Sequence, residues 1–248
     1  MTLRPGLFQD FPEIVAAMST RQGGVPGSPF GMNLSYRVGD DPSRVHENRA
    51  AFFGSLGIPL DRLAIPSQVH SATVRDVDRA GEYPECDALL TGTRDVALCV
   101  TVADCVPILL YAPARGVIGA VHAGWRGTSA GILVLAVERM RELFQVDPSD
   151  LRAWLGPSAA VCCYTVGGDV ASQFDARFVA RDGRGIVLDL KSANRHLLLS
   201  AGVKPERIEV SPACTITESN RFHSYRRDRE ASGRMMAVIA LRPSPSAR

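Results

Sequence analysis

The chain has 248 residues, 46% apolar and 22% charged, which is the composition of a folded globular protein and excludes a disordered or fibrous one. Its formal net charge is +2, from 28 lysines and arginines against 26 acidic residues, so charge gives no basis for a nucleic-acid or anionic-membrane partner. We therefore expect a small-molecule partner.

An early segment, residues 21–29, is dense in glycine and proline, and we expect an exposed loop of the kind that often contacts ligands. Asp41 and Pro42 then supply an N-cap and a helix-compatible first residue. The apolar positions that follow, as far as Gly57, predict an amphipathic helix that covers a sheet.

Three aliphatic and β-branched runs in the middle of the chain, 95–102, 106–111 and 116–121, are predicted strands. Their near-continuous hydrophobicity indicates burial on both faces. The next segment, 128–144, has apolar residues at helical spacing, which predicts a helix capped by one of its first two residues.

The second half of the chain predicts a strand at 152–155, helices at 169–178 and 192–201, and a final core strand at 235–241. Strands at hairpin spacing with helices interspersed among them favour an α+β fold over regular βαβ alternation.

The organisation of the chain predicts one domain, because residues 1–248 contain no internal repeat and no linker. A flexible tail is expected at about 243–248, where proline and serine alternate. The N-terminal residues lack the pattern of a signal peptide, and no apolar run is long enough to span a bilayer. These observations predict a cytoplasmic protein without a membrane partner.

The six cysteines fit no paired disulfide framework. Cys86 and Cys99 lie in or beside apolar runs, where reduced cysteines serve as small hydrophobic residues. Cys162 and Cys163 are adjacent, and a disulfide between them would be strained. We interpret these four as packing residues.

Cys105 and His122 each stand where an apolar strand pattern gives way to small, turn-forming residues, a place where a sheet can present reactive groups to a ligand. With His70 they offer the thiolate and imidazole ligands of zinc, and three protein ligands plus an open position are typical of a catalytic site. Their separations are too long for a zinc finger, so they would converge through the fold. The alternative is a buried cysteine with two hydrogen-bonded histidines.

Two other interpretations use the same residues. Cys105 could be a nucleophile with His122 as its base and Asp104, His70 or a backbone group as the orienting partner. Copper is also compatible with imidazole and thiolate ligands.

Arg126 lies between Gly124 and Gly127 in a segment that leads into the predicted helix at 128–144, which makes it a candidate for binding phosphate or carboxylate. Near the C-terminus, Arg226 and Arg227 stand next to an aromatic residue and could stack on or neutralise a ligand. Tyr164 follows a constrained loop and is a candidate for the wall of a pocket. The alternative for Arg226 and Arg227 is a solvent-exposed turn that binds no ligand.

Several motifs together resemble the multicopper polyphenol oxidase or laccase-like domain family, which includes purine nucleoside phosphorylases and the peptidoglycan editing factor. The likeness runs from the loop at 20–24 to 232–234, nearly the whole chain. The motifs that carry it are Ser67-Gln68-Val69-His70, Asp87-Ala88-Leu89-Leu90-Thr91, Thr101-Val102-Ala103-Asp104-Cys105-Val106-Pro107, Val121-His122-Ala123-Gly124-Trp125-Arg126-Gly127 and Cys162-Cys163-Tyr164.

The resemblance implies a single α+β domain with mixed β-sheets layered between α-helices. It also implies that His70, Cys105 and His122 are zinc ligands and the catalytic centre. Family members are described as phosphorolysing adenosine, inosine and S-methyl-5'-thioadenosine and as deaminating adenosine, with copper-dependent phenol oxidation as the older ascription. The substrate-binding candidates are then Asn33, Arg126, Tyr164 and Arg226.

Two positions depart from the family pattern. Arg37 stands where a histidine is expected, and His223 stands where an aromatic residue is expected. Both bear on substrate preference and leave the three ligands intact. A true multicopper site needs many histidines, and this chain has five in total.

The leading prediction is a zinc-dependent purine nucleoside enzyme whose partners are a purine nucleoside and phosphate. The alternatives are a cysteine or metal hydrolase that edits a peptidoglycan precursor, a copper-dependent polyphenol oxidase, and a non-catalytic metal- or nucleotide-binding regulatory module.

Overall fold

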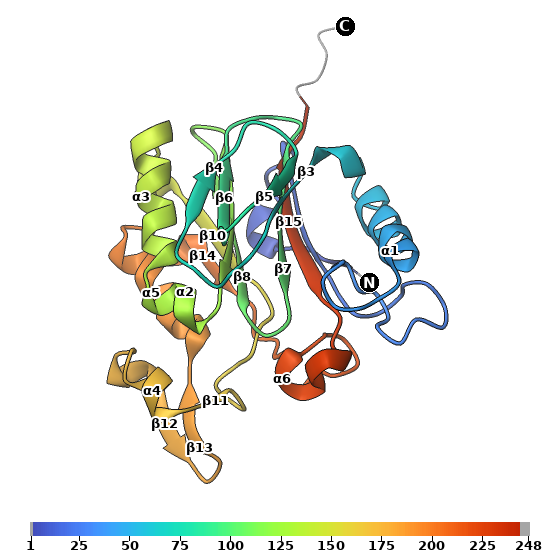
Figure 1. Ribbon diagram of the computed structural model, residues 1–248. Coiled ribbons are helices and arrows are strands. Elements are labelled where there is room, and N and C mark those ends of the chain that lie inside the picture. Colours follow the sequence, from blue (N-terminus) through green and yellow to red (C-terminus); the bar gives the residue numbers. More distant parts are fainter. Residues whose placement is uncertain (1, 244–248) are drawn as a thin grey trace, which may run out of the picture.

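Within residues 2–243, which the computed structural model describes, two six-stranded sheets stand face to face (Figure 1). The first has the order β1-β2-β15-β7-β3-β5, formed by Thr2–Leu3, Ile14–Ser19, Met235–Leu241, Ala97–Val102, Leu63–Pro66 and Gly81–Tyr83. The second has the order β14-β10-β8-β9-β6-β4, formed by Ile208–Val210, Arg152–Leu155, Val106–Ala112, Val117–Ala123, Ala88–Thr91 and Val74–Asp76. Both sheets contain parallel and antiparallel pairs.

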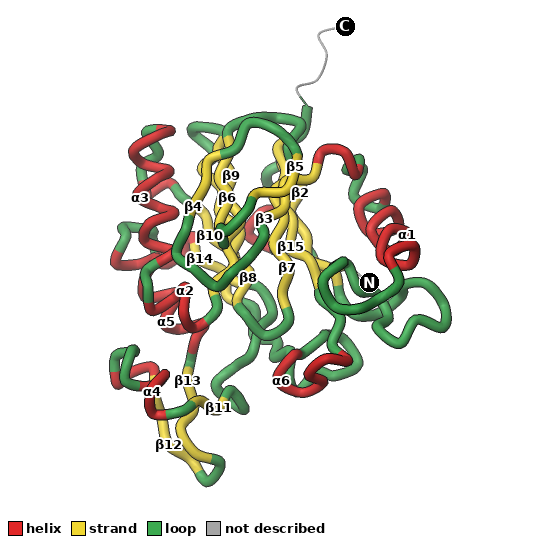
Figure 2. Tube along the Cα trace, viewed as in Figure 1, coloured by secondary structure: helices red, strands yellow, loops and turns green. Residues whose placement is uncertain are grey.

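Helices cover the two outer faces, so the layers are helix, sheet, sheet and helix (Figure 2). The α-helices are α1 Pro42–Gly54, α2 Trp125–Ser129, α3 Ile132–Phe144, α4 Gly168–Ala171, α5 Leu190–Ser200 and α6 Tyr225–Asp228. Helix α1 packs Phe52 and Phe53 against the first sheet, whereas α3 and α5 cover the second. The predicted α+β architecture of mixed sheets layered between helices is confirmed.

Side chains alternate between two apolar layers along the central strands, as the period of a strand requires. In β8, Ile108 and Leu110 face the helices, and Leu109 and Tyr111 lie between the sheets. In β9 the even-numbered Ile118 and Ala120 belong to the layer between the sheets, while odd-numbered neighbours face the helices. The expectation that these strands are buried on both faces is confirmed.

The chain passes repeatedly from one sheet to the other between β3 and β8. Strands β3, β5 and β7 belong to the first sheet, and β4, β6 and β8, which follow them in turn, belong to the second. The connections at 67–73, 84–87 and 103–105 therefore each lead from the first sheet to the second. Residues far apart in the sequence can meet where these connections lie together.

The predicted strands match the structure closely. Strands β10 and β15 have the expected bounds, and the expected strands at 95–102, 106–111 and 116–121 correspond to β7, β8 and β9 with ends shifted by one or two residues. The expected loop at 21–29 contains no helix or strand. The predicted tail at about 243–248 lies, apart from Pro243, outside the described residues.

Three predicted helices differ from the observed ones. The segment 128–144 is not one helix, because Gly131 adopts the left-handed conformation (φ 78°) and separates α2 from α3. The segment 169–178 forms the single turn α4 and then a 3₁₀ turn at Ala176–Phe178. Helix α1 has the expected Asp41 cap, which accepts from the Ser43 amide at 2.8 Å, but it ends at Gly54 instead of Gly57.

A small third sheet stands apart from the two main sheets. It has the order β11-β13-β12, formed by Thr165–Val166, Gly185–Leu188 and Val179–Asp182, and α4 lies beside it (Figure 1).

None of the helices within residues 2–243 combines the length and apolar character needed to cross a bilayer.

Candidate metal centre and the cavity around it

The pairing of β8 with β9 brings Cys105 and His122 together. In this antiparallel pair Val106 lies opposite Ala123 and Pro107 lies opposite His122, so the start of β8 and the end of β9 share one edge of the sheet. His122 has the same parity as Ile118 and Ala120, which places it on the side facing the first sheet.

Asp87 holds the segment that carries His70. Its carboxylate accepts hydrogen bonds from the amides of Val69 (3.2 Å), His70 (3.0 Å) and Ser71 (2.7 Å) and from the Ser71 hydroxyl (2.9 Å). These amides fix the connection between β3 and β4 in a bend where His70 has φ 61°, which is uncommon for a residue other than glycine. A buried carboxylate thus holds an exposed histidine in place.

Asp87 also binds His122, with 2.8 Å between its Oδ1 and the imidazole Nδ1. The bond leaves Nε2 as the ring nitrogen for a ligand, which is the carboxylate–histidine arrangement of protein metal sites. Asp87 therefore orients His122, a role for which the nucleophile interpretation names Asp104, His70 or a backbone group instead. A carboxylate immediately before an apolar strand was the available signal, because a charge is buried there only with partners.

The ligand atoms of His70, Cys105 and His122 all lie within 4.8 Å of one another. The two imidazole rings are in edge contact, with 4.9 Å between their centroids. Gly124 leaves room for this group, since a Cβ there would lie 2.9 Å from the Cys105 Sγ and 3.2 Å from the His70 Cδ2. One thiol and two imidazoles at this spacing fit the donor preferences of zinc and also of copper.

Electrostatics favours an ionised thiol at this site. Burial opposes ionisation of Cys105, but the charge and hydrogen bonding of His122, followed by those of His70, outweigh it and lower the thiol pKa to about 6. Burial likewise works against protonation of His122, yet Cys105 and Asp87 raise its pKa to about 9. For Asp87, burial is outweighed by His122 and the Ser71 amide, and its pKa falls to about 2. The thiolate needed by a metal ion is therefore present at neutral pH.

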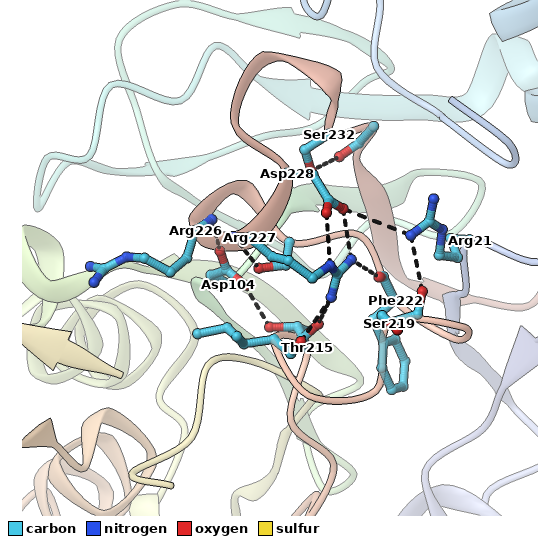
Figure 3. Close-up of polar contacts among 12 residues, drawn as sticks. Arg21, Asp104, Thr215, Ser219, Phe222, Arg226, Arg227, Asp228 and Ser232 are labelled. Carbon is cyan, nitrogen blue, oxygen red and sulfur yellow. Dashed lines mark hydrogen bonds and ion pairs between the residues drawn. The ribbon is translucent and has the colours of Figure 1, made fainter. Parts of the chain in front are cut away.

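Asp104 does not orient His122, contrary to the nucleophile interpretation. Its carboxylate accepts from the Thr215 hydroxyl at 2.7 Å and from the Arg226 amide at 2.6 Å, as Figure 3 shows. Its backbone adopts φ 85°, immediately before Cys105. Asp104 thus ties the start of β8 to the C-terminal segment that carries α6.

A cavity of about 630 Å³ opens beside the three ligands. Five arginines line it, and they come from five separate segments of the chain: Arg37, Arg49, Arg126, Arg226 and Arg234. Aromatic side chains from α2, α6 and two loops complete the wall: Tyr36, Trp125, Tyr164 and Tyr225. The combination offers stacking surfaces for a flat ring and cationic groups for an anion.

Three of the four substrate-binding candidates line this cavity. Arg126 is exposed, lies within α2 instead of preceding a helix, and has its guanidinium 4.3 Å from the Trp125 ring centroid. Arg226 donates to the Thr165 carbonyl oxygen at 2.6 Å and lies 5.2 Å from the Tyr164 ring centroid. Burial is the main cause that raises the pKa of Tyr164 to about 12, so its hydroxyl keeps its proton.

The structure does not bring Asn33 to the cavity. Its side chain is fully buried and donates to the Ser35 carbonyl oxygen (3.0 Å) and to Asp40 (3.0 Å), while its Oδ1 accepts from the amides of Ser35 and Arg234. Asn33 therefore holds two loops together. Arg234, which it helps to position, is among the cavity residues that sequence reasoning missed.

Arg227 has a structural environment that differs from that of Arg226. Its guanidinium donates to the carbonyl oxygens of Thr215, Ile216 and Phe222 and pairs with Asp228 at 2.7 Å (Figure 3). These bonds fix the loop before α6. Arg227 does not line the cavity, so of the two adjacent arginines Arg226 alone faces it.

His223, one of the two departures from the family pattern, is buried, with 1% of its surface exposed. Neither ring nitrogen makes a hydrogen bond within the described part of the chain. Burial, with the nearby guanidinium groups of Arg21 and Arg234, lowers the pKa of His223 to about 3, against smaller opposing effects of the Met32 backbone and of Asp228. The folded protein therefore carries His223 in its neutral form. Arg37, the other departure, lines the cavity and donates to the Ser67 hydroxyl at 2.5 Å.

His223 makes the fold sensitive to acid. The unfolded chain binds a proton at this residue below its ordinary pKa of 6.5, whereas the folded chain does so only near pH 3. Stability is thus lost as the pH falls through this window, by about 2 kcal/mol between pH 6.5 and pH 5. Relative to wild type, His223→Phe should gain this amount over that interval in urea unfolding. His46→Gln, on the exposed side of α1, is the control. If the free energies of unfolding of wild type and His223→Phe differ by the same amount at every pH, the lowered pKa of His223 is contradicted.

The comparisons with known proteins agree on one family. Residues 15–242 match the family model described as multi-copper polyphenol oxidoreductase laccase. A purine nucleoside phosphorylase of Deinococcus radiodurans is 45% identical over 231 residues, covering 91% of this chain and 88% of the relative. A protein named adenosine deaminase RL5, from an unknown prokaryotic organism, is 38% identical and covers 92% of this chain and 94% of its own. The crystal structure of YlmD from Geobacillus stearothermophilus superposes with a TM-score of 0.89 at 37% identity, covering 95% of this chain and 94% of that one.

Proposed function

The chain belongs to the multi-copper polyphenol oxidoreductase laccase family, and from that premise we propose that it is a zinc-dependent enzyme of purine nucleosides. It would phosphorolyse adenosine, inosine and S-methyl-5'-thioadenosine and deaminate adenosine. The observation that carries the proposal is the convergence of one cysteine and two histidines at the wall of a cavity rich in arginine and aromatic residues. The printed names of the relatives, purine nucleoside phosphorylase and adenosine deaminase, support the same substrate class.

His70, Cys105 and His122 would hold the metal ion, and Asp87 would orient His122. When bound, zinc supplies a Lewis acid beside the purine and lowers the pKa of water. Zinc is favoured over several copper ions because the other histidines, at positions 46, 196 and 223, belong to no metal-binding group among the described residues. A reduced thiol ligand also suits the cytoplasm.

The walls of the cavity would bind and orient the nucleoside. Trp125, Tyr164 and Tyr225 offer flat surfaces on which a purine can stack. Tyr164 keeps its hydroxyl proton at neutral pH, so it can donate a hydrogen bond to a ring nitrogen or a ribose oxygen. Enclosure by these side chains would exclude bulk water from the reacting atoms and strengthen every charge interaction there.

The arginines would hold phosphate for the phosphorolysis reaction. Arg226 is fixed by Thr165 and cannot turn freely, whereas the guanidinium of Arg126 rests on the Trp125 ring and makes no hydrogen bond to the described residues. Arg126 can therefore give both of its outer nitrogens to a phosphate. Glu82 and Glu230 also line the cavity and would direct the anion toward the side away from them.

Arg126→Ala is expected to raise the KM for phosphate in adenosine phosphorolysis by about tenfold to a hundredfold. A hydrogen bond to a charged group contributes about 1.5–3 kcal/mol, which corresponds to this range. The KM for adenosine in deamination should change much less, because that reaction uses no phosphate. Arg141→Ala, at the exposed end of α3, serves as the control. Equal effects on both reactions would show that Arg126 binds the nucleoside instead.

Product identification after incubation with adenosine, with and without phosphate, tests the proposal as a whole. Adenine that appears only with phosphate reports phosphorolysis, and inosine that appears without it reports deamination. Metal content is measured on the same preparation. Turnover of a phenol after added copper, with no purine product, would favour the polyphenol oxidase suggested by the family's description. Absence of purine product and of phenol oxidation would favour a peptidoglycan-editing hydrolase or a binding module.

A further inference from the structure

Three cysteines form a second cluster outside the cavity. The Sγ atoms of Cys162, Cys163 and Cys214 lie within 4.8 Å of one another. Cys163 and Cys214, 51 residues apart in the sequence, have 3.3 Å between their sulfur atoms, and Cys162 and Cys163 have 3.4 Å. Cys162 and Cys163 are neighbours in the sequence, but only the fold brings Cys214 into contact with Cys163.

The three thiols differ in access to solvent. Cys214 is buried, with 5% of its surface exposed, Cys163 is half-buried, and Cys162 is exposed. A small oxidant can therefore reach Cys163 from the side of Cys162, while Cys214 stands behind it. This is the arrangement of a thiol that is attacked and a second thiol that resolves the product.

The charges around the cluster favour one thiolate, on Cys214, over a bound cation, because burial and the hydrogen bonds to Cys214 and Cys162 raise the pKa of Cys163. The Lys191 ammonium group donates to the Ser211 (2.8 Å) and Ala213 (2.6 Å) carbonyl oxygens, which places it beside Cys214, and Arg184 donates to the Cys162 carbonyl oxygen. Burial opposes ionisation of Cys214, but hydrogen bonds from the Thr217 amide and hydroxyl and from neighbouring groups lower its pKa to about 7. Cationic side chains stabilise a thiolate and repel a metal ion.

We propose that Cys163 and Cys214 are a modification site that forms a reversible disulfide when the protein meets a hydroperoxide. The Cys214 thiolate acts as the base: it takes the Cys163 proton across the sulfur–sulfur contact as the Cys163 sulfur attacks the outer peroxide oxygen. The O–O bond breaks, the other oxygen takes that proton and leaves as an alcohol or water, and Cys163 becomes a sulfenic acid. The Cys214 thiolate then attacks the Cys163 sulfur, the S–O bond breaks, and hydroxide leaves. The two cysteines lose two electrons, which the peroxide gains.

The disulfide would join the loop that carries Tyr164, on the wall of the cavity, to the loop that carries Thr215. Cys163 precedes Tyr164, which lines the cavity, and Cys214 precedes Thr215, which donates to Asp104 (Figure 3). A bond of about 2 Å between the sulfur atoms would fix the distance between these loops. Oxidation at the cluster would thus be felt at the residue that precedes Cys105, without any change to the metal ligands.

Peptide mapping of the full-length, metal-loaded protein tests the proposal independently of any enzymatic activity. The protein is treated with hydrogen peroxide, remaining thiols are alkylated, and tryptic peptides are analysed without reduction. The expected product is peptide 153–177 linked to peptide 208–221, two hydrogens lighter than their sum and separated by dithiothreitol. The oxidised protein should also have a higher midpoint of thermal unfolding, because the link constrains the unfolded chain.

Single substitutions identify the sulfur atoms. Cys162→Ser should keep the link and the rise in the unfolding midpoint, whereas Cys163→Ser should lose both, and Cys214→Ser repeats the second test. The proposal is overturned if peroxide leaves Cys163 and Cys214 open to alkylation, or if the linked peptide persists in Cys163→Ser. It is also overturned if purified wild-type protein holds a second equivalent of metal that Cys163→Ser lacks, because the thiols would then be ligands.

Discussion

Cys105→Ser is expected to abolish metal binding and to reduce turnover of adenosine by at least about a hundredfold, since even the loss of a partner of a ligand weakens metal sites tenfold to a hundredfold. The thiol of Cys105 has a pKa of about 6 and offers a thiolate at neutral pH, whereas the serine hydroxyl stays protonated. Zinc analysis after gel filtration and a coupled assay of adenosine consumption provide the two measurements.

Cys162→Ser is the matched control for this change, because it removes an exposed thiol that does not line the cavity. It should keep full metal content and turnover. Chelation of the wild-type protein distinguishes a metal-ligand role of Cys105 from a nucleophile role. A wild-type protein that stays active after its metal is chelated, and that is then inactivated by iodoacetamide, would make Cys105 the nucleophile and would refute the metal assignment.

Asp87→Asn is expected to weaken metal binding by about tenfold to a hundredfold, because His122 loses the carboxylate that orients it. It should also lower the free energy of unfolding by about 2–4 kcal/mol, since one buried carboxylate accepts bonds from the 69–71 amides and an amide NH₂ group would meet those donors. A competition titration with a zinc-binding dye and urea unfolding of the metal-free protein measure the two effects separately.

The pH dependence of the wild type gives a further check on Asp87. Its pKa is about 2 in the fold against an ordinary 3.8, so its contribution to stability is present above about pH 3.8 and is lost as the pH falls toward 2. Asp87→Asn should lack this loss. Asp78→Asn, at an exposed position nearby, is the control. If Asp87→Asn binds zinc as tightly as wild type, the carboxylate does not orient the ligand.

Cys105 and His122 could be found in the sequence because each stands at a break in an apolar run. The breaks after β7 and at the end of β9 are visible as short polar or small-residue segments, and antiparallel pairing of neighbouring strands then brings Cys105 and His122 together. The bounds of β10 and β15 were also predictable, since β15 is apolar throughout and ends before Arg242, and β10 is apolar after Arg152 and ends before the Gly156-Pro157 pair.

Other features depend on tertiary structure that no local pattern contains. The apolar spacing of 128–144 continues across Gly131, so periodicity does not show that the helix is divided there. Asp87 resembles a turn residue until the amides of 69–71 are seen to surround it. The cavity arginines at 49 and 234 come from α1 and from the segment before β15, and only the packing of these elements brings them to one wall.

A metal ion at the candidate site would also stabilise the fold, because its ligands lie on or beside the connections that pass from the first sheet to the second. His70 lies in the connection at 67–73, Asp87 ends the one at 84–87, and Cys105 ends the one at 103–105. A metal ion shared by His70, Cys105 and His122 would therefore cross-link the connections between the two sheets. Its binding energy would stabilise these connections in particular. Chelation should speed amide hydrogen exchange in these connections while α3, on the outer face, keeps its protection.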